Sequence, residues 1–147
     1  MQSFIYRLTL TNKLNDGEQK MSSQKDGSEK AYTDDEVNKF LKAELPHWYL
    51  EKGWIRRKYK TTSWKSTLMV VNTVGHLAEA GFHHPDMAIS YAFVIVKLTN
   101  HAAKGITDKD FELAKKIEEV IMWQPGKEGL ALPGTPDDAR FKYIKYD

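Results

Sequence analysis

The sequence predicts an α+β domain: a four-stranded antiparallel sheet with helices packed on one face, in the order α-β-β-α-β-β-α. Three segments, residues 33–45, 63–80 and 108–122, repeat their apolar residues at helical spacing. Two pairs of short, strand-like runs lie between these segments, and the connections within each pair are short enough for hairpins. Helices with one apolar stripe bury it best against one face of such a sheet.

The composition fits a single domain without disulfide bonds. The chain has 147 residues, no cysteine and a formal net charge of +2. The lack of cysteine excludes thiolate metal sites and is typical of a reducing compartment, so we predict a cytoplasmic protein. The small net charge does not favour direct binding to nucleic acid. No apolar run approaches the roughly 20 residues of a membrane helix, so we predict no membrane association.

We divide the chain into three parts. Residues 1–31 are a predicted flexible N-terminal extension, because their second half is polar and rich in Gly, Ser and Lys. Within it, residues 1–14 alternate in polarity and could form a strand. Residues 32–122 hold the predicted domain. Residues 123–147 are a tail whose prolines and glycines exclude a long helix, and its aromatic residues predict packing on the domain or on a neighbouring subunit.

The first helix and the first hairpin have clear local signals. Thr33-x-x-Glu36 is a capping box that starts the helix, and Pro46 ends it. Two strands are predicted at residues 48–50 and 54–59, around a Lys-Gly turn.

Positive charge lies on one face of the second predicted strand. Arg56, Lys58 and Lys60 alternate along the chain and share this face with Trp54. We interpret this strand as a solvent-exposed edge strand protected by its charge. A phosphate-binding patch is the alternative interpretation.

The second helix is the predicted centre of the core. Ser63 is its expected N-cap, Ala80 its expected last residue, and Gly81 the expected C′ glycine. Glu79 lies in the last turn, where a carboxylate is unfavourable because of the helix dipole. Pairing of Glu79 with a nearby imidazole would offset this cost.

The second hairpin and the third helix complete the domain. Strands are predicted at residues 87–90 and 93–99, and a loop follows them. Thr107-x-x-Asp110 then caps the helix predicted at 108–122, which leaves the Asp110 carboxylate in the first turn.

Three of the five histidines lie between two carboxylates in one short stretch of chain. The histidines are His83, His84 and His101, and the carboxylates are Glu79 and Asp110. A turn near residues 90–92 would bring them together. Imidazole exchanges protons near neutral pH, so the cluster indicates acid/base catalysis.

Two other interpretations of the histidines stay open. The histidines could be structural. Three imidazoles could also bind zinc with a water at the open position, and His76 could join Glu79 on one helix face. However, the adjacent His83 and His84 point to opposite sides of an extended chain, which disfavours a shared metal. We therefore predict neither a metal nor another cofactor.

The spacing Glu79-x3-His83-His84-Pro85-x5-Tyr91-x9-His101-x8-Asp110 resembles the signature of the pterin-4a-carbinolamine dehydratases. The resemblance covers roughly residues 33–122. It implies the fold order given above and dehydration of a 4a-hydroxytetrahydropterin.

The resemblance also implies roles for individual residues. His83, His84 and His101 are the expected catalytic residues, and His84 also binds the pterin. Glu79 and Asp110 would orient the imidazoles or bind the pterin ring.

Two further residues are expected to bind substrate. Pro85 belongs to the signature itself. Trp48 matches a tryptophan that lines the pterin site in the family, and a purely structural core tryptophan is the alternative for this residue.

The predicted function is therefore recycling of a pterin cofactor by a metal-free dehydratase. The alternative is a non-catalytic binding protein on the same fold, like the RuBisCO assembly factors or the transcription-factor dimerisation cofactor that the family resembles. The resemblance also implies a homodimer or homotetramer, and a protein client is possible.

Overall fold

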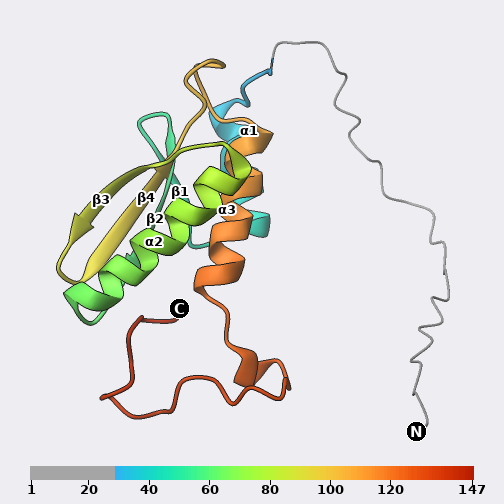
Figure 1. Cartoon of the computed structure of the whole chain (residues 1–147). Helices are drawn as coiled ribbons and strands as arrows, with labels where there is room; N and C mark the ends of the chain where they lie inside the picture. Colours follow the sequence, from blue (N-terminus) through green and yellow to red (C-terminus); the bar gives the residue numbers. More distant parts are fainter. Residues whose placement is uncertain (1–28) are drawn as a thin grey trace, which may run out of the picture.

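A computed structural model describes residues 29–147 of the chain. The strand predicted within residues 1–14 lies outside the described residues. The elements in the described part follow the predicted order (Figure 1): α1 (Asp34–Glu44), β1 (Tyr49–Glu51), β2 (Trp54–Lys60), α2 (Trp64–Gly81), β3 (Asp86–Ser90), β4 (Phe93–Leu98), α3 (Asp108–Ile121) and the short 3₁₀ helix η1 (Pro125–Lys127).

The strands form one antiparallel sheet in the order β1-β2-β4-β3. The two hairpins pair β1 with β2 and β3 with β4, as predicted. The sheet is joined at its centre by β2 and β4, where Ile55 lies opposite Leu98 and Lys60 lies opposite Phe93. The predicted fold class is confirmed.

The helices bury one face of the sheet (Figure 1). Alternate residues of β4 are fully buried, as expected for a strand covered on one side. The helices add the other half of the core. Its main members are Val37 and Leu41 of α1, Val70, Val74 and Ala78 of α2, and Phe111, Ala114 and Ile117 of α3. No helix within residues 29–147 has both the length and the apolar character needed to cross a bilayer.

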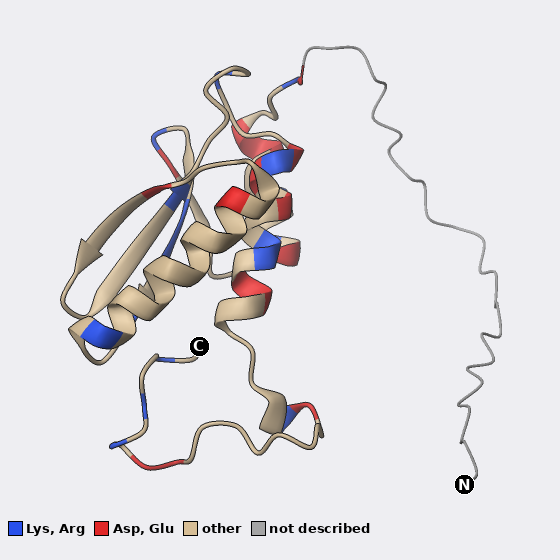
Figure 2. Cartoon of the chain, in the orientation of Figure 1, with Lys and Arg blue, Asp and Glu red and all other residues tan. Residues whose placement is uncertain are grey.

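The place of β2 in the sheet differs from the prediction. β2 lies between β1 and β4, so its interpretation as an edge strand is wrong. Sheet order depends on pairing between residues far apart in sequence, which a local charge pattern does not contain. The charged face itself points away from the helices: Arg56 forms an ion pair with Glu51 at 2.6 Å, and Lys58 and Lys60 are exposed. Figure 2 shows this positive charge along β2.

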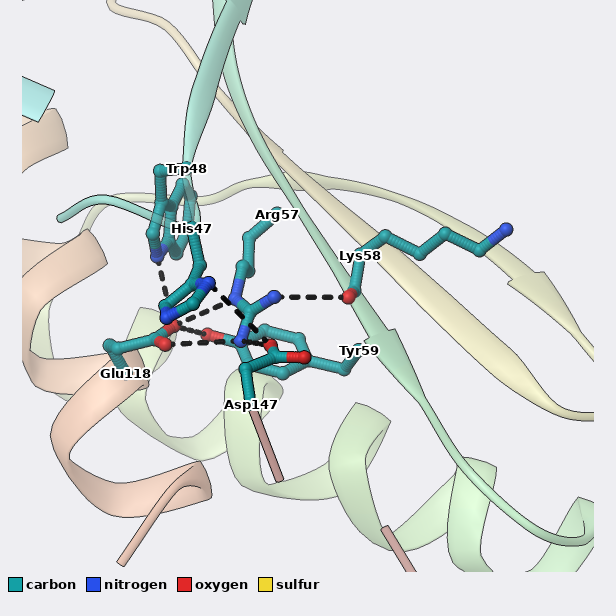
Figure 3. A network of polar contacts seen from close by, with 7 residues as sticks. All are labelled: His47, Trp48, Arg57, Lys58, Tyr59, Glu118 and Asp147. Atoms are coloured by element: carbon teal, nitrogen blue, oxygen red, sulfur yellow. Dashed lines mark hydrogen bonds and ion pairs between the residues drawn. The ribbon is translucent and has the colours of Figure 1, made fainter. Parts of the chain in front are cut away.

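The opposite face of β2 carries a buried cation, Arg57 (Figure 3). Its Nε and Nη2 donate to the Glu118 carboxylate of α3 over 3.1 and 3.2 Å. The same carboxylate accepts hydrogen bonds from the Trp48 indole at 3.0 Å and the Tyr59 hydroxyl at 2.7 Å. Burial and the negative charge of Glu118 raise the pKa of Tyr59 far above its ordinary value, so Tyr59 remains a donor. This network joins the sheet to α3.

The last residues of the tail contact the edge of β2. Ile144 is buried and forms an isolated β-bridge with Thr61. The Lys145 N–H donates to the Lys60 carbonyl over 2.9 Å. Asp147 Oδ2 then accepts from Arg57 Nη2 at 2.5 Å. The tail is therefore held by backbone pairing, apolar burial and an ion pair.

We expect Glu118→Ala to lower the free energy of unfolding by about 3 kcal/mol, because it leaves the buried Arg57 charge without its main partner. Denaturant-induced unfolding measures this change. Glu119→Ala is the matched control, since Glu119 is exposed and pairs with Lys116 on the helix surface, where a loss of at most about 0.5 kcal/mol is expected. Equal losses in the two variants would contradict a structural role for the Glu118 network.

The contribution of Asp147 to stability should depend on pH. Burial alone raises the pKa of its carboxyl, but the hydrogen bond and charge of Arg57 outweigh burial and hold the pKa below its ordinary value. A depressed folded-state pKa stabilises the protein above the unfolded-state pKa, and this contribution is lost as pH falls through the folded-state value.

Asp147→Asn should therefore lower the unfolding free energy by up to about 1 kcal/mol above roughly pH 4, with the difference from wild type disappearing in more acidic solution. Urea unfolding at a series of pH values measures it. Asp137→Asn is the control, because Asp137 is 96% exposed and its one ion pair within residues 29–147 is with Lys142. If the difference in unfolding free energy between Asp147→Asn and wild type is the same at every pH, the Arg57–Asp147 ion pair is not its source.

Candidate functional site

His83 and Asp110 form a close pair between the end of α2 and the start of α3. His83 Nε2 lies 2.7 Å from Asp110 Oδ1. The Asp110 side chain is fully buried and that of His83 is 15% exposed. When the Asp110 carboxylate is ionised it can only accept a hydrogen bond, and the imidazole hydrogen then lies on Nε2. Nδ1 is then the imidazole atom that can accept a proton.

The other oxygen of Asp110 caps helix α3. Asp110 Oδ2 accepts from the Thr107 backbone N–H at 2.8 Å and lies 3.4 Å from the Thr107 hydroxyl. The capping arrangement predicted for Thr107 and Asp110 is therefore present. Because one oxygen is held by the cap, the oxygen that faces His83 has a defined position. The helix start thus orients the imidazole.

His84 belongs to a second, solvent-exposed pair. His84 Nε2 lies 3.1 Å from Glu79 Oε2, and the two side chains are 55% and 75% exposed. The neighbouring histidines therefore contact different carboxylates, His83 towards the interior and His84 at the surface. This agrees with the expectation that adjacent residues of an extended segment point to opposite sides.

The turn that carries the histidine pair begins at Phe82, not at Gly81 as predicted. Helix α2 continues through Gly81, and Phe82 has the left-handed conformation, with φ 49° and ψ 42°. The Phe82 N–H bonds to the Glu79 carbonyl at 3.2 Å and the His83 N–H to the Ala78 carbonyl at 3.1 Å. These bonds satisfy the last carbonyls of the helix in a Schellman-like turn. The prediction chose Gly81 because glycine adopts the left-handed conformation most easily, but this preference alone does not fix the residue at which a helix ends.

His101 lies in the loop after β4 and contacts an aromatic residue instead of a carboxylate. Its ring centroid is 5.4 Å from that of Trp54, with the rings inclined at 76°. Lys97 Nζ lies 5.4 Å from the Trp54 ring centroid and 3.6 Å from Asp86 Oδ2. His101 is exposed, and no hydrogen bond among residues 29–147 joins it to either of the other two site histidines.

Strand pairing brings these groups to one end of the sheet. Asp86, which begins β3, lies opposite Lys97 near the end of β4. Ile55, near the start of β2, lies opposite Leu98. The segment before β3, the loop after β4 and the start of β2 therefore meet at the same end, which is the upper end of the sheet in Figure 1. The predicted fold-back of the histidine segment is present.

The loop that carries His101 is held by Asn100. The Asn100 backbone exchanges two hydrogen bonds with Gly105, and its Oδ1 accepts from the Ala103 N–H at 3.1 Å. Its Nδ2 donates to the Thr107 hydroxyl at 3.3 Å. Thr107 also bonds to Asp110, so the supports of the His101 loop and of the His83–Asp110 pair are connected.

The remaining predicted site residues lie at the edge of this region or outside it. Pro85 is half-buried between His84 and Asp86. Trp48 is 3% exposed and donates to Glu118, as a core residue of the Arg57 network (Figure 3). Contact of either residue with a substrate stays a prediction.

Within residues 29–147, no three His, Cys, Asp or Glu side chains lie close enough together to hold a metal ion. His76, which the zinc interpretation included, is exposed on α2.

Sequence reasoning did not assign four residues of this region to the site: Phe82, Trp54, Lys97 and Asn100. An aromatic side chain directly before the histidine pair was a usable signal for Phe82. Trp54 was noted only as part of the charged face of β2. The contact between Trp54 and His101 depends on strand pairing, which local patterns do not contain.

Comparison with known proteins shows the family of this chain. The family model described as pterin 4 alpha carbinolamine dehydratase matches residues 30–120, which include all of the predicted site residues. The chain belongs to the pterin-4a-carbinolamine dehydratase family.

Relatives from distant organisms support the assignment. A protein of Aquifex aeolicus, named provisionally as a pterin-4-alpha-carbinolamine dehydratase, is 44% identical over 89 residues, which cover 60% of this chain and 89% of the relative. A protein of Sulfurisphaera tokodaii with the same provisional name is 39% identical over 92 residues, covering 63% of this chain and 98% of the relative.

A solved structure has the same fold. The transcriptional coactivator/pterin dehydratase from Brucella melitensis is 26% identical, with a TM-score of 0.56, over 61% of this chain and 97% of that chain. The dehydratase core of this chain therefore spans nearly the whole of its relatives. The matched region ends near the end of α3, so η1 and the tail lie beyond it.

Asp110→Ala should lower the free energy of unfolding by about 2 kcal/mol, because it removes the α3 cap and leaves His83 without its buried partner. Glu79→Ala removes the matching carboxylate from the exposed His84 pair and should cost at most about 0.5 kcal/mol. Chemical denaturation of both variants tests the contrast. If Asp110→Ala and Glu79→Ala lower the unfolding free energy by the same amount, the buried His83–Asp110 pair contributes no more to stability than the exposed pair.

Proposed function

We propose that this protein dehydrates a 4a-hydroxytetrahydropterin to the quinonoid dihydropterin by metal-free acid/base catalysis. The observation that carries the proposal is the buried His83–Asp110 pair, with a separation of 2.7 Å and the carboxylate fixed by a helix cap. Membership of the dehydratase family supports the reaction class.

The reaction needs one acid and one base. The bond between C4a and the hydroxyl oxygen breaks, the proton on N5 is lost, and a C4a–N5 double bond forms as water leaves. The ring electrons drive the departure of the hydroxyl, so atoms and electrons balance without an oxidant or reductant. Proton donation to the leaving oxygen and proton removal at N5 are the steps that positioned imidazoles accelerate.

His83 is suited to one of these transfers. Its Nε2 hydrogen faces Asp110, which leaves Nδ1 as the atom that exchanges a proton with the substrate. Asp110 stabilises the imidazolium that forms when Nδ1 takes a proton, because the two charges are held together away from water. Asp110 acts through His83 and is a positioning residue.

His101 is proposed for the second transfer and His84 for contact with the pterin. Both side chains are exposed, as groups that meet an incoming substrate must be. His101 is placed by Trp54 and by the loop that Asn100 holds, and His84 by Glu79. Pro85 and Trp48 are proposed to contact the pterin as well, although the Trp48 indole N–H already donates to Glu118.

The second candidate function is that of a non-catalytic binding protein on the same fold. The observation that favours it is the tail, which lies beyond the family match and packs along β2. A surface added to the dehydratase core is what a protein client would recognise.

Three further properties stay predictions: self-association as a dimer or tetramer, a protein client and a cytoplasmic location. Self-association is supported by three exposed apolar residues of α2, Trp64, Leu68 and Met69.

The deciding measurement is the dehydration of freshly generated 4a-hydroxytetrahydropterin, followed by ultraviolet absorbance in the presence of a chelator. Wild-type protein should exceed the spontaneous rate, and His83→Ala should lower kcat by about 10²- to 10⁴-fold, the usual contribution of a positioned acid or base. His76→Ala is the matched control, because His76 is exposed on α2 and lies outside the family signature, and it should retain the wild-type rate.

A folded wild-type protein that gives no acceleration would exclude the dehydratase function and favour the binding protein. Equal loss in His83→Ala and His76→Ala would instead contradict the assignment of His83.

A further inference from the structure

Phe82 combines a strained backbone with an exposed aromatic ring. Its φ of 49° lies in the left-handed region, which favours Gly and Asn and is rare for a bulky residue. The residue is 82% exposed, the highest value among the exposed large apolar residues of the described chain. Packing of the described residues therefore does not account for the ring.

The fold needs the conformation of Phe82 and does not need its side chain. The left-handed residue allows the Phe82 and His83 N–H groups to bond to the carbonyls of Glu79 and Ala78. Gly or Asn would make the same backbone bonds with less strain. A phenyl ring at this position is thus unfavourable for the isolated fold in two respects, since it strains the backbone and exposes apolar surface.

The ring lies next to the candidate site. Its centroid is 5.6 Å from that of the His84 imidazole, with the two planes inclined at 77°. His84 is in turn 3.1 Å from Glu79. Phe82 therefore adds an apolar surface beside a group of polar side chains at the end of α2.

We infer that Phe82 is a specificity-determining residue that packs its ring against the flat face of the bicyclic pterin, an inference that rests on the proposed function. A planar, polarisable heterocycle stacks well on an aromatic ring, and its hydrogen-bonding groups lie at its edge, where His84 and Glu79 can reach them. The ring thus gives affinity for the ring system without taking part in proton transfer. The alternative use for such a ring is a contact with a second copy of the chain.

The test uses the full chain and 7,8-dihydrobiopterin, a stable reduced pterin, as the probe. Phe82→Asn removes the ring and suits the left-handed backbone, whereas Phe82→Tyr keeps the ring. Phe141→Asn is the matched control, because Phe141 is an exposed phenylalanine of the tail, with its ring centroid 5.6 Å from the Arg140 guanidinium.

We expect Phe82→Asn to raise the dissociation constant of the probe and the KM about tenfold, in the range of base stacking on an aromatic residue, with kcat changed less than about twofold. Phe82→Tyr and Phe141→Asn should bind like wild type. Phe82→Asn should also melt at the same temperature or higher, because the strain is relieved, so weaker binding would not reflect unfolding.

The outcomes separate this inference from the proposed function. If wild-type protein does not bind the probe or accelerate dehydration, both fail. If wild type binds and Phe82→Asn binds equally well, the role of Phe82 is overturned and the proposed function stands. If light scattering shows that Phe82→Asn loses affinity together with a change in oligomeric state, the ring is a contact between copies and the inference is also overturned.

Discussion

The candidate site depends on one carboxylate that serves two structures. Asp110 closes the first turn of α3 through Thr107 with one oxygen and holds His83 with the other. The cap alone would need only a surface residue, yet Asp110 is fully buried. The cost of burying the charge is offset by its hydrogen bonds to the helix start and the imidazole. As a result, the position of the His83 imidazole is tied to the start of helix α3.

The three histidines of the candidate site differ in how deeply they are buried. His83 is inside, and His84 and His101 are exposed. Thr107 joins the support of Asp110 to Asn100 and hence to the His101 loop. The mostly buried His83 and the exposed His101 therefore share one connected set of hydrogen-bonded supports.

Much of this could be predicted from the sequence, where the rules are local. The capping boxes at Thr33 and Thr107 located two helix starts, because a cap depends on residues only three positions apart. The sequence also suggested that Glu79 and Asp110 pair with nearby imidazoles, and the structure pairs His84 with Glu79 and His83 with Asp110. The fold class could be predicted from the order of helices and strands along the chain, because strands joined by a short connection pair as an antiparallel hairpin.

The predictions that failed concern long-range packing. β2 became a central strand because it pairs with β4, and Arg57 became a buried cation because Glu118 of α3 lies beneath it. Neither fact is contained in the alternation of charges along β2. Phe82 took the left-handed position expected for Gly81, because α2 continues one residue further than the local glycine signal indicated.

The pairing of the tail with β2 has a consequence for how sheets of this protein can meet. β1 covers only the first half of β2, and the tail covers the end of β2 through Thr61, Lys60 and Thr62. Backbone groups that would otherwise template another strand at this edge are occupied by the chain itself. The tail thus covers the part of the β2 edge that β1 leaves open, and a strand that extends the sheet would have to add at the outer edge of β1 or of β3.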